Sequence, residues 1–169
     1  MKLVTEQRDW CLKFFDANKP EARTRVHNPP TRWAQPKNGL YKVNYDAAIF
    51  DSLGYAGLGV VIRDSARQII ATLSQKIGLP HSVETAEALA ALRVVVFAKE
   101  LSIFKIIVEG DCLKVVQALK AREHCNTLYG NVIEDARLQG ASLQVCHFQH
   151  IRREGNKLAH ALARERFHP

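Results

Sequence analysis

Three acidic residues that are far apart in the sequence have the placement expected of a divalent-cation site. Asp46 lies in an alternating, strand-like run, Glu87 lies inside a helical pattern over residues 82–100, and Asp111 follows the β-branched run 106–108. Carboxylates that converge from separate rigid elements repel one another strongly unless a cation neutralises them, and hard divalent cations take oxygen ligands. The three residues therefore indicate a metal-dependent enzyme.

Two of these acids also have a simpler interpretation that involves no function. In a helix, Glu87 would head an apolar stripe formed by Ala90, Ala91 and Val94, where a carboxylate is costly to bury without a partner. That partner is a metal ion, a hydrogen-bond donor or the cation of a structural salt bridge. Asp111 precedes another helical pattern, and aspartate is among the best helix N-cap residues. The residues alone leave these alternatives open.

The elements that must position these acids can be placed from hydrophobic periodicity and turn signals. Strands are predicted at residues 41–47, 56–63, 68–75, 105–109 and 142–149, and helices at 82–100, just after 111, at 127–139 and at 156–166. Short turns join the first three strands, which predicts an antiparallel meander. The later strands alternate with helices, which favours parallel pairing. We therefore expect an α/β fold with a five-stranded mixed sheet and helices on both faces.

Gly57 and Gly59 form a short glycine motif that does not fit a phosphate-binding loop. Such a loop needs its glycines between a strand and a helix, whereas β-branched residues follow directly here. We interpret them as strand glycines, which mark a bulge or the close approach of another backbone or a ligand.

The chain divides into a basic N-terminal arm and one globular domain. A stretch rich in Pro and Asn over residues 18–39 is the only convincing linker, so residues 1–38 are assigned to an arm or connector and 39–169 to the domain. The arm holds eight Lys/Arg against four acidic residues, so it supplies +4 of the total net charge of +7. A basic excess favours a polyanionic partner, nucleic acid first, although the same charge would also serve solubility.

Other features restrict the class of protein. No run approaches the ~18 uncharged apolar residues of a membrane span, and the charged first residues do not resemble a signal peptide. The four cysteines lack CxxC spacing, which favours thiols in a reducing compartment, so we expect an intracellular protein of the nucleus or the cytoplasm. A zinc site built from Cys146, His147 and His150 is disfavoured, because no second ligand pair accompanies it.

Five segments, in order and spacing, resemble the type 1 ribonuclease H domain, in particular its plant-type branch from retrotransposon-derived, reverse-transcriptase-like proteins. The segments are Trp33 to Ala48, Gly54 to Asp64, Glu84 to Ala90, Val108 to Asp111, and Phe148 to Arg164. Together they span nearly all of the predicted domain. The resemblance implies the ribonuclease H-like fold, whose mixed sheet agrees with the elements predicted above.

The resemblance also implies roles for individual residues. Asp46 corresponds to the first-strand aspartate that bridges two cations, Glu87 to the helix glutamate, and Asp111 to the aspartate after the fourth strand. His160 stands at the family's fourth acidic position, and His150 is near the place of a mobile histidine that handles a proton. Metal ligands are therefore expected at Asp46, Glu87, Asp111 and His160.

The function implied is a metal-dependent endonuclease that cleaves the RNA strand of RNA/DNA hybrids with two Mg²⁺ ions. Mn²⁺ is the alternative cation, because the imidazole of His160 suits it better. We expect a monomer that binds hybrid or other nucleic acid and no membrane, with a reverse transcriptase domain in a longer parent protein. Ala48 and Cys112 stand where hydroxyl-bearing residues are usual in the family. Two other classes stay open: a nucleic-acid-binding module with weak or no catalysis, and an interaction domain of a domesticated mobile element.

Overall fold

One five-stranded sheet organises the protein in the computed structural model, which describes residues 33–165. The strands are β1 (Tyr41–Phe50), β2 (Tyr55–Arg63), β3 (Ile69–Gly78), β4 (Lys105–Gly110) and β5 (Val145–His150). They lie in the order β3-β2-β1-β4-β5. The pairs β1–β2 and β2–β3 are antiparallel, whereas β1–β4 and β4–β5 are parallel. The predicted mixed sheet, an antiparallel meander followed by parallel strands, is confirmed.

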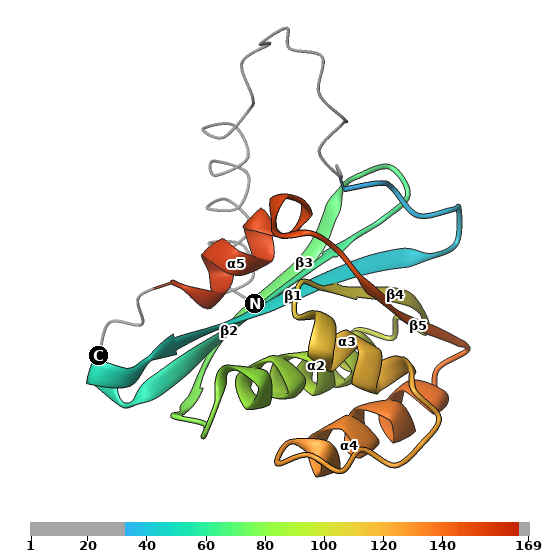
Figure 1. Cartoon of the computed structure of the whole chain (residues 1–169). Coiled ribbons are helices and arrows are strands. Elements are labelled where there is room, and N and C mark those ends of the chain that lie inside the picture. The colour runs from blue at the N-terminus through green and yellow to red at the C-terminus, as the bar shows by residue number, and fades with distance from the viewer. Residues whose placement is uncertain (1–32, 166–169) are drawn as a thin grey trace, which may run out of the picture.

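Helices cover both faces of the sheet (Figure 1). The helices α2 (Val83–Glu100), α3 (Leu113–Lys120) and α4 (Gly130–Ala141) lie on one side, and α5 (Lys157–Ala163) lies on the other. Single turns of 3-10 helix at Asp51–Leu53 and Arg153–Gly155 complete the elements. Within residues 33–165, no helix has the length and hydropathy needed to cross a bilayer.

The order of the predicted elements is confirmed, but some of their ends differ. The fifth strand begins at Val145 rather than at residue 142, because Ser142 and Leu143 still donate backbone hydrogen bonds to the last turn of α4. The helix α4 begins at Gly130 rather than at 127, where the preceding loop folds back so closely that a Cβ on Gly130 would overlap the Cys125 carbonyl group.

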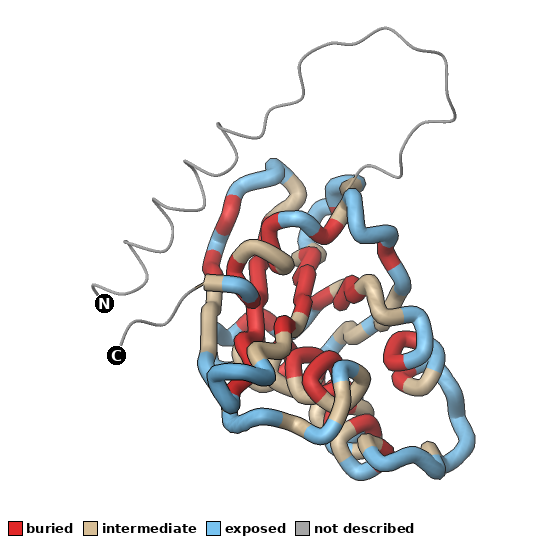
Figure 2. Tube along the Cα trace, turned by 60° about the vertical axis from the view of Figure 1, so that its left-hand side comes forward, coloured by how far each residue is buried: buried red, intermediate tan, exposed pale blue. Residues whose placement is uncertain are grey.

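The buried segments gather in the interior of the fold (Figure 2), and the larger part of the core lies between the sheet and α2. Small side chains line α2 on its buried faces, which lets this helix pack closely against β1 and against α4. A second, smaller cluster lies under α5 and consists of Val61, Ile69, Leu158, Ala159 and Leu162. The two clusters fix helices on opposite faces of the same strands.

Gly59 explains how closely α5 approaches the sheet. It lies on β2 directly opposite Asp46 of β1, and a Cβ at this position would overlap the Ala159 carbonyl oxygen and the Ala163 backbone nitrogen. A strand glycine allows this close approach of another backbone. The expectation of a close approach at these glycines therefore holds for Gly59, and the neighbour is a helix of the same chain.

The polar face of β1 is buried, and the segment before β1 covers it. Lys42 Nζ lies 3.0 Å from Glu109 Oε1, and Asn44 Nδ2 donates to Glu109 Oε2 at 2.9 Å. Trp33 Nε1 in turn donates to Asn44 Oδ1 at 3.0 Å, and the Arg63 guanidinium lies 4.7 Å from the centre of the Trp33 ring. Part of the segment assigned to the arm, residues 33–38, is therefore in contact with the sheet.

Replacing Gly59 by alanine is expected to push α5 away from β2, because the new Cβ has no room against the helix backbone. We expect the free energy of unfolding, measured by urea denaturation, to fall by about 1–3 kcal/mol. The matched control is Gly78→Ala on β3, where no atom lies within 4 Å of the added Cβ, and it should change stability little. Equal losses in the two variants would contradict the close packing of α5.

Candidate metal centre and active site

Two adjacent parallel strands bring Asp46 and Asp111 to the same place. The last parallel pair between β1 and β4 joins Asn44 to Glu109. Asp46 lies two residues farther along β1, and Asp111 lies two residues beyond Glu109, just after β4 ends at Gly110. Because side chains alternate along a strand, Asp46 lies on the same face as Asn44. At Asp111 the chain leaves the sheet, beside the part of β1 that continues past the end of β4 and carries Asp46.

Glu87 reaches this place from α2. The helix begins after Ser82, whose Oγ accepts a hydrogen bond from the Thr85 backbone N–H at 3.1 Å, as expected of an N-cap serine. Glu87 lies in the next turn and is buried, and its Oε1 accepts a hydrogen bond from the Ala47 backbone N–H at 3.3 Å. The N-cap and the packing of α2 thus set the point where this carboxylate meets β1.

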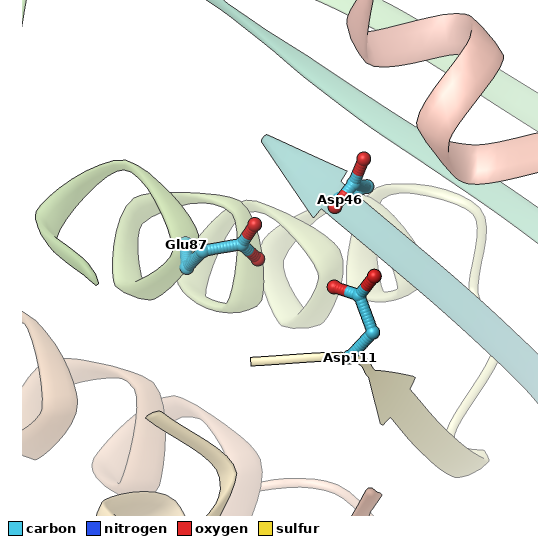
Figure 3. A group of neighbouring side chains, drawn as sticks. All are labelled: Asp46, Glu87 and Asp111. Atoms are coloured by element: carbon cyan, nitrogen blue, oxygen red, sulfur yellow. The ribbon is translucent and has the colours of Figure 1, made fainter. Parts of the chain in front are cut away.

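The three carboxylates point toward one another (Figure 3). Asp46, Glu87 and Asp111 each offer one ligand oxygen, and these oxygens lie within 4.8 Å of one another. Asp46 and Glu87 are only 1% and 3% exposed, whereas Asp111 is partly accessible. Among residues 33–165 no other cluster of His, Cys, Asp and Glu has metal-binding geometry. Oxygen donors alone, in this number, fit a hard divalent cation.

The electrostatics of the cluster agree with a site for a cation. Burial, and then the charges of Asp46 and Asp111, raise the pKa of Glu87 to about 9. Burial and the charge of Asp111 raise the pKa of Asp46 to about 6, against the opposing effect of His160. A divalent cation would supply the positive charge that lets all three groups ionise together.

The simpler interpretations of Glu87 and Asp111 do not fit the structure. Within the described part of the chain, no basic side chain forms an ion pair with Glu87, and its Oε2 is buried without a hydrogen-bond partner. The helix α3 begins at Leu113 with Cys112 at its N-cap, and no side chain caps it. Asp111 is therefore not the cap of this helix, and Glu87 is not a salt-bridged structural residue.

His160 lies beside the cluster rather than in it. Its Nδ1 is 2.5 Å from Asp46 Oδ2, so α5 brings the imidazole against the carboxylate from the face opposite α2. The side chain is one-third exposed. The hydrogen bond and the charge of His160 act to lower the pKa of Asp46, against burial.

The connection between β5 and α5 adds further groups at the edge of the site. His150 is exposed at the end of β5, with its Nε2 3.2 Å from the Asp111 backbone oxygen. Arg153 Nε lies 3.5 Å from Asp111 Oδ2. Asn156, which is buried, donates from Nδ2 to the Tyr45 backbone oxygen at 2.7 Å and ties the connection to β1.

Arg153 and Asn156 are residues that sequence reasoning missed. The only signal for them was the polar composition of the connection before the last predicted helix, where two arginines precede an acidic residue, a glycine and an asparagine. That composition indicates a loop but does not show which of its side chains turns toward the acids.

The stability of the metal-free protein is expected to fall as the pH rises from 4.5 to about 9. The raised pKa of Glu87 means that, between these pH values, the folded chain keeps a proton that the unfolded chain has released. The contribution of this proton to the free energy of unfolding is therefore complete below pH 4.5 and lost by about pH 9. Urea denaturation in EDTA across this range measures the slope. Glu87→Gln should flatten the slope, because an amide does not ionise, whereas Glu123→Gln at an exposed position should leave it unchanged.

Comparisons with known proteins identify the family and the fold. The profile of the reverse transcriptase-like family matches residues 44–166. Among solved structures, RNase H1 of the archaeon Halobacterium salinarum is similar, with a TM-score of 0.67 and 23% identity over 73% of this chain and 94% of that chain. No curated protein matches the sequence closely enough to count as a relative.

Two complexes with nucleic acid are also similar in fold. LC11-RNase H1 bound to an RNA/DNA hybrid, a protein isolated from compost, has a TM-score of 0.59 and 23% identity over 72% of this chain and 92% of that chain. The foamy viral protease-reverse transcriptase with an RNA/DNA hybrid has a TM-score of 0.58 and 17% identity over 86% of this chain but only 22% of its own. Identities this low show the fold alone. Since the family profile covers most of the chain and the fold agrees with that of RNase H1, the chain belongs to the reverse transcriptase-like family and has the ribonuclease H-like fold.

Proposed function

We propose that this domain is a divalent-metal-dependent endonuclease that cleaves the RNA strand of RNA/DNA hybrids. The observation that carries the proposal is the convergence of Asp46, Glu87 and Asp111 from β1, α2 and the end of β4, with one oxygen of each within 4.8 Å of the others. Family membership and the hybrids bound by two proteins of similar fold support the choice of substrate.

The proposed chemistry is hydrolysis of a phosphodiester by in-line attack of water. Bound Mg²⁺, two ions in this proposal, would supply activation of the water and stabilisation of the leaving oxygen. The carboxylates of this chain would hold them, with Asp46 shared between the two, as the resemblance to the family implies. Mg²⁺ prefers carboxylate and water oxygens, and Mn²⁺ would tolerate an imidazole nearby better.

The two histidines would have different tasks. His160 contacts Asp46 at 2.5 Å, so we assign it to orienting this carboxylate and to the edge of the metal site. His150 is exposed beside the backbone of Asp111, so a substrate could reach it, and we assign it to proton transfer at the leaving group. Arg153, close to Asp111 and largely exposed, would meet a phosphate of the bound strand.

A hybrid is a fitting substrate for a basic protein that lacks a sequence-reading motif. One strand of a hybrid exposes 2′-hydroxyls in a wide, shallow groove that is recognised by shape, and Lys and Arg supply the affinity for phosphates. We propose a monomer that acts where hybrids form, in the nucleus or the cytoplasm, within the plant-type branch of retrotransposon-derived proteins. A reverse transcriptase domain in a longer parent protein would supply the hybrid. The foamy viral protease-reverse transcriptase, which is in complex with a hybrid, is likewise longer than the part that matches this chain.

A second candidate is a hybrid-binding module with little or no catalysis. The observation that favours it is the contact of His160 with Asp46 Oδ2, which engages an oxygen that a bridging ligand would use. The binding module is also favoured by Ala48 and Cys112, which stand at family positions that usually carry hydroxyls. A third class, an interaction domain without nucleic acid, would leave the buried acidic cluster unexplained.

Cleavage of a labelled RNA/DNA hybrid with Mg²⁺, Mn²⁺ or EDTA tests the proposal. The wild-type protein should cleave only with a cation, and Asp111→Asn should lower the rate by orders of magnitude. The same substitution should leave metal-free stability unchanged or raise it, because it relieves like-charge repulsion. Asp135→Asn, at an exposed position on α4, is the matched control and should change neither quantity. Hybrid binding in EDTA without cleavage in either cation would favour the binding module.

Deleting residues 1–32 tests the arm while leaving Trp33 on the sheet. The deletion removes seven Lys/Arg and four acidic residues, a net charge of +3. Hybrid affinity should fall, and the slope of log affinity against log salt should shrink by roughly 0.7–0.9 for each phosphate that the arm had neutralised. The unfolding temperature should stay the same, which shows that the domain is intact. Unchanged affinity and slope would make the arm a connector only.

A further inference from the structure

Glu109 joins three parallel strands at one level of the sheet. It lies on β4, and its register partners are Asn44 on β1 and Gln149 on β5. Its Oε2 accepts a hydrogen bond from Asn44 Nδ2 at 2.9 Å, and its Oε1 accepts one from Gln149 Nε2 at 2.5 Å. Because the two oxygens of one carboxylate bond to different neighbouring strands, Glu109 forms a side-chain bridge across β1, β4 and β5.

This Glu109 bridge lies at the end of the pairing between β1 and β4. The parallel ladder between these strands ends with the pair Asn44 and Glu109, and β4 itself ends one residue later at Gly110. Asp46 and Asp111 each follow two residues beyond the bridge. The ladder therefore stops short of the two aspartates, and the bridge is placed where the strands begin to separate.

The two aspartates put a demand on this end of the sheet. Their ligand oxygens lie within 4.8 Å of each other, and ionised carboxylates at that distance repel, which acts to push the ends of β1 and β4 apart. Mg²⁺ takes oxygen ligands at about 2.0–2.1 Å in nearly octahedral geometry, so it tolerates little displacement of its ligands. A link that fixes the spacing of the two strands next to Asp46 and Asp111 answers both requirements.

Stability alone does not account for the bridge. Lys42, Asn44 and Glu109 are only 5%, 1% and 3% exposed, and Trp33 Nε1 donates to Asn44 Oδ1 from the segment that covers them. A buried ion pair is often no more stabilising than apolar residues of the same volume, because its charges lose their hydration. Apolar side chains, however, lack directional bonds, and fixing a register is the best-attested use of buried polar groups. The bridge therefore contributes position as well as cohesion.

We propose that Glu109 is a positioning residue of the metal centre, which holds the ends of β1 and β4 at the spacing that lets Asp46 and Asp111 bind the same cation. The proposal rests on the proposed metal-dependent function. Glu109 is not itself a ligand, because both of its oxygens are engaged by side chains of β1 and β5. It acts through the strands, in the layer of groups that orients metal ligands.

Glu109→Gln and Asn44→Leu test the bridge in two ways. Glu109→Gln replaces one acceptor oxygen by an amide donor, so the side chain can no longer accept from both neighbouring strands. Asn44→Leu removes the bond to β1 at similar volume and without a change of charge. In both variants the affinity for Mn²⁺, titrated calorimetrically with the full chain and without nucleic acid, should fall about tenfold. With hybrid substrate, kcat should fall while KM for the hybrid stays the same.

Two further variants separate position from stability. Adding Gln149→Glu to Glu109→Gln exchanges carboxylate and amide, so donors again face acceptors at the same net charge, and this double variant should recover Mn²⁺ affinity. The carboxylate stays beside Lys42, because Lys42 Nζ and Gln149 Nε2 contact the same oxygen of Glu109. Ile133→Val, in the core on α4, is the matched control, which should lower the unfolding temperature but leave Mn²⁺ affinity unchanged. All titrations are made at a temperature at which circular dichroism shows every variant folded.

The outcomes separate this proposal from the proposed function. Mn²⁺ affinity that is equal in the wild type and in both bridge variants would make Glu109 a structural residue and overturn its positioning role, while leaving a metal-dependent nuclease intact. A loss of affinity in Glu109→Gln but not in Asn44→Leu would assign the effect to the lost charge and also overturn it, as would a double variant that folds without recovering affinity. No Mn²⁺ binding by the wild type would overturn both proposals.

Discussion

Mutual repulsion among three converging carboxyl groups, two of them buried, is the constraint on which the structure of this domain depends. Burial removes water from Asp46 and Glu87, and the charge of Asp111 adds to that effect, so the pKa of Asp46 and that of Glu87 are both raised. The groups cannot relax apart, because β1, β4 and α2 are fixed by the sheet and by the main core. The fold therefore holds an arrangement in which all three groups can be ionised together only when positive charge is supplied from outside.

Glu109 shows what a buried acid looks like when the chain itself provides its partners. It lies on β4 two residues before Asp111, yet Lys42 pairs with it, and Asn44 and Gln149 donate hydrogen bonds to it. Such a pair is neutral overall and offers no oxygen to a cation. The contrast distinguishes the acids that stabilise the sheet from those that remain available for chemistry.

Much of this could be predicted from the sequence, because the strongest signals are local. Alternation along residues 41–47 and the helical period after Ser82 determine where Asp46 and Glu87 stand on their elements, and the predicted sheet is confirmed. Contacts that join distant segments were not predictable in the same way. Nothing local in Arg153 or Asn156 shows that they meet the site, because their neighbours are set by packing. The burial of the polar face of β1 was missed for the same reason, since Trp33 covers it from outside the strand.

The helix α5 is short and packs on a cluster separate from the main core. It has seven residues and carries His160. Three of its side chains form a five-residue cluster with Val61 and Ile69 of the sheet. Short helices of this kind depend on such contacts, and segments with few of them open more easily than the main core. Brief opening of α5 would admit water to Asp46 while β1, β4 and α2 stay folded. The access of water to the Asp46 carboxylate would then depend on the local unfolding equilibrium of a single short helix.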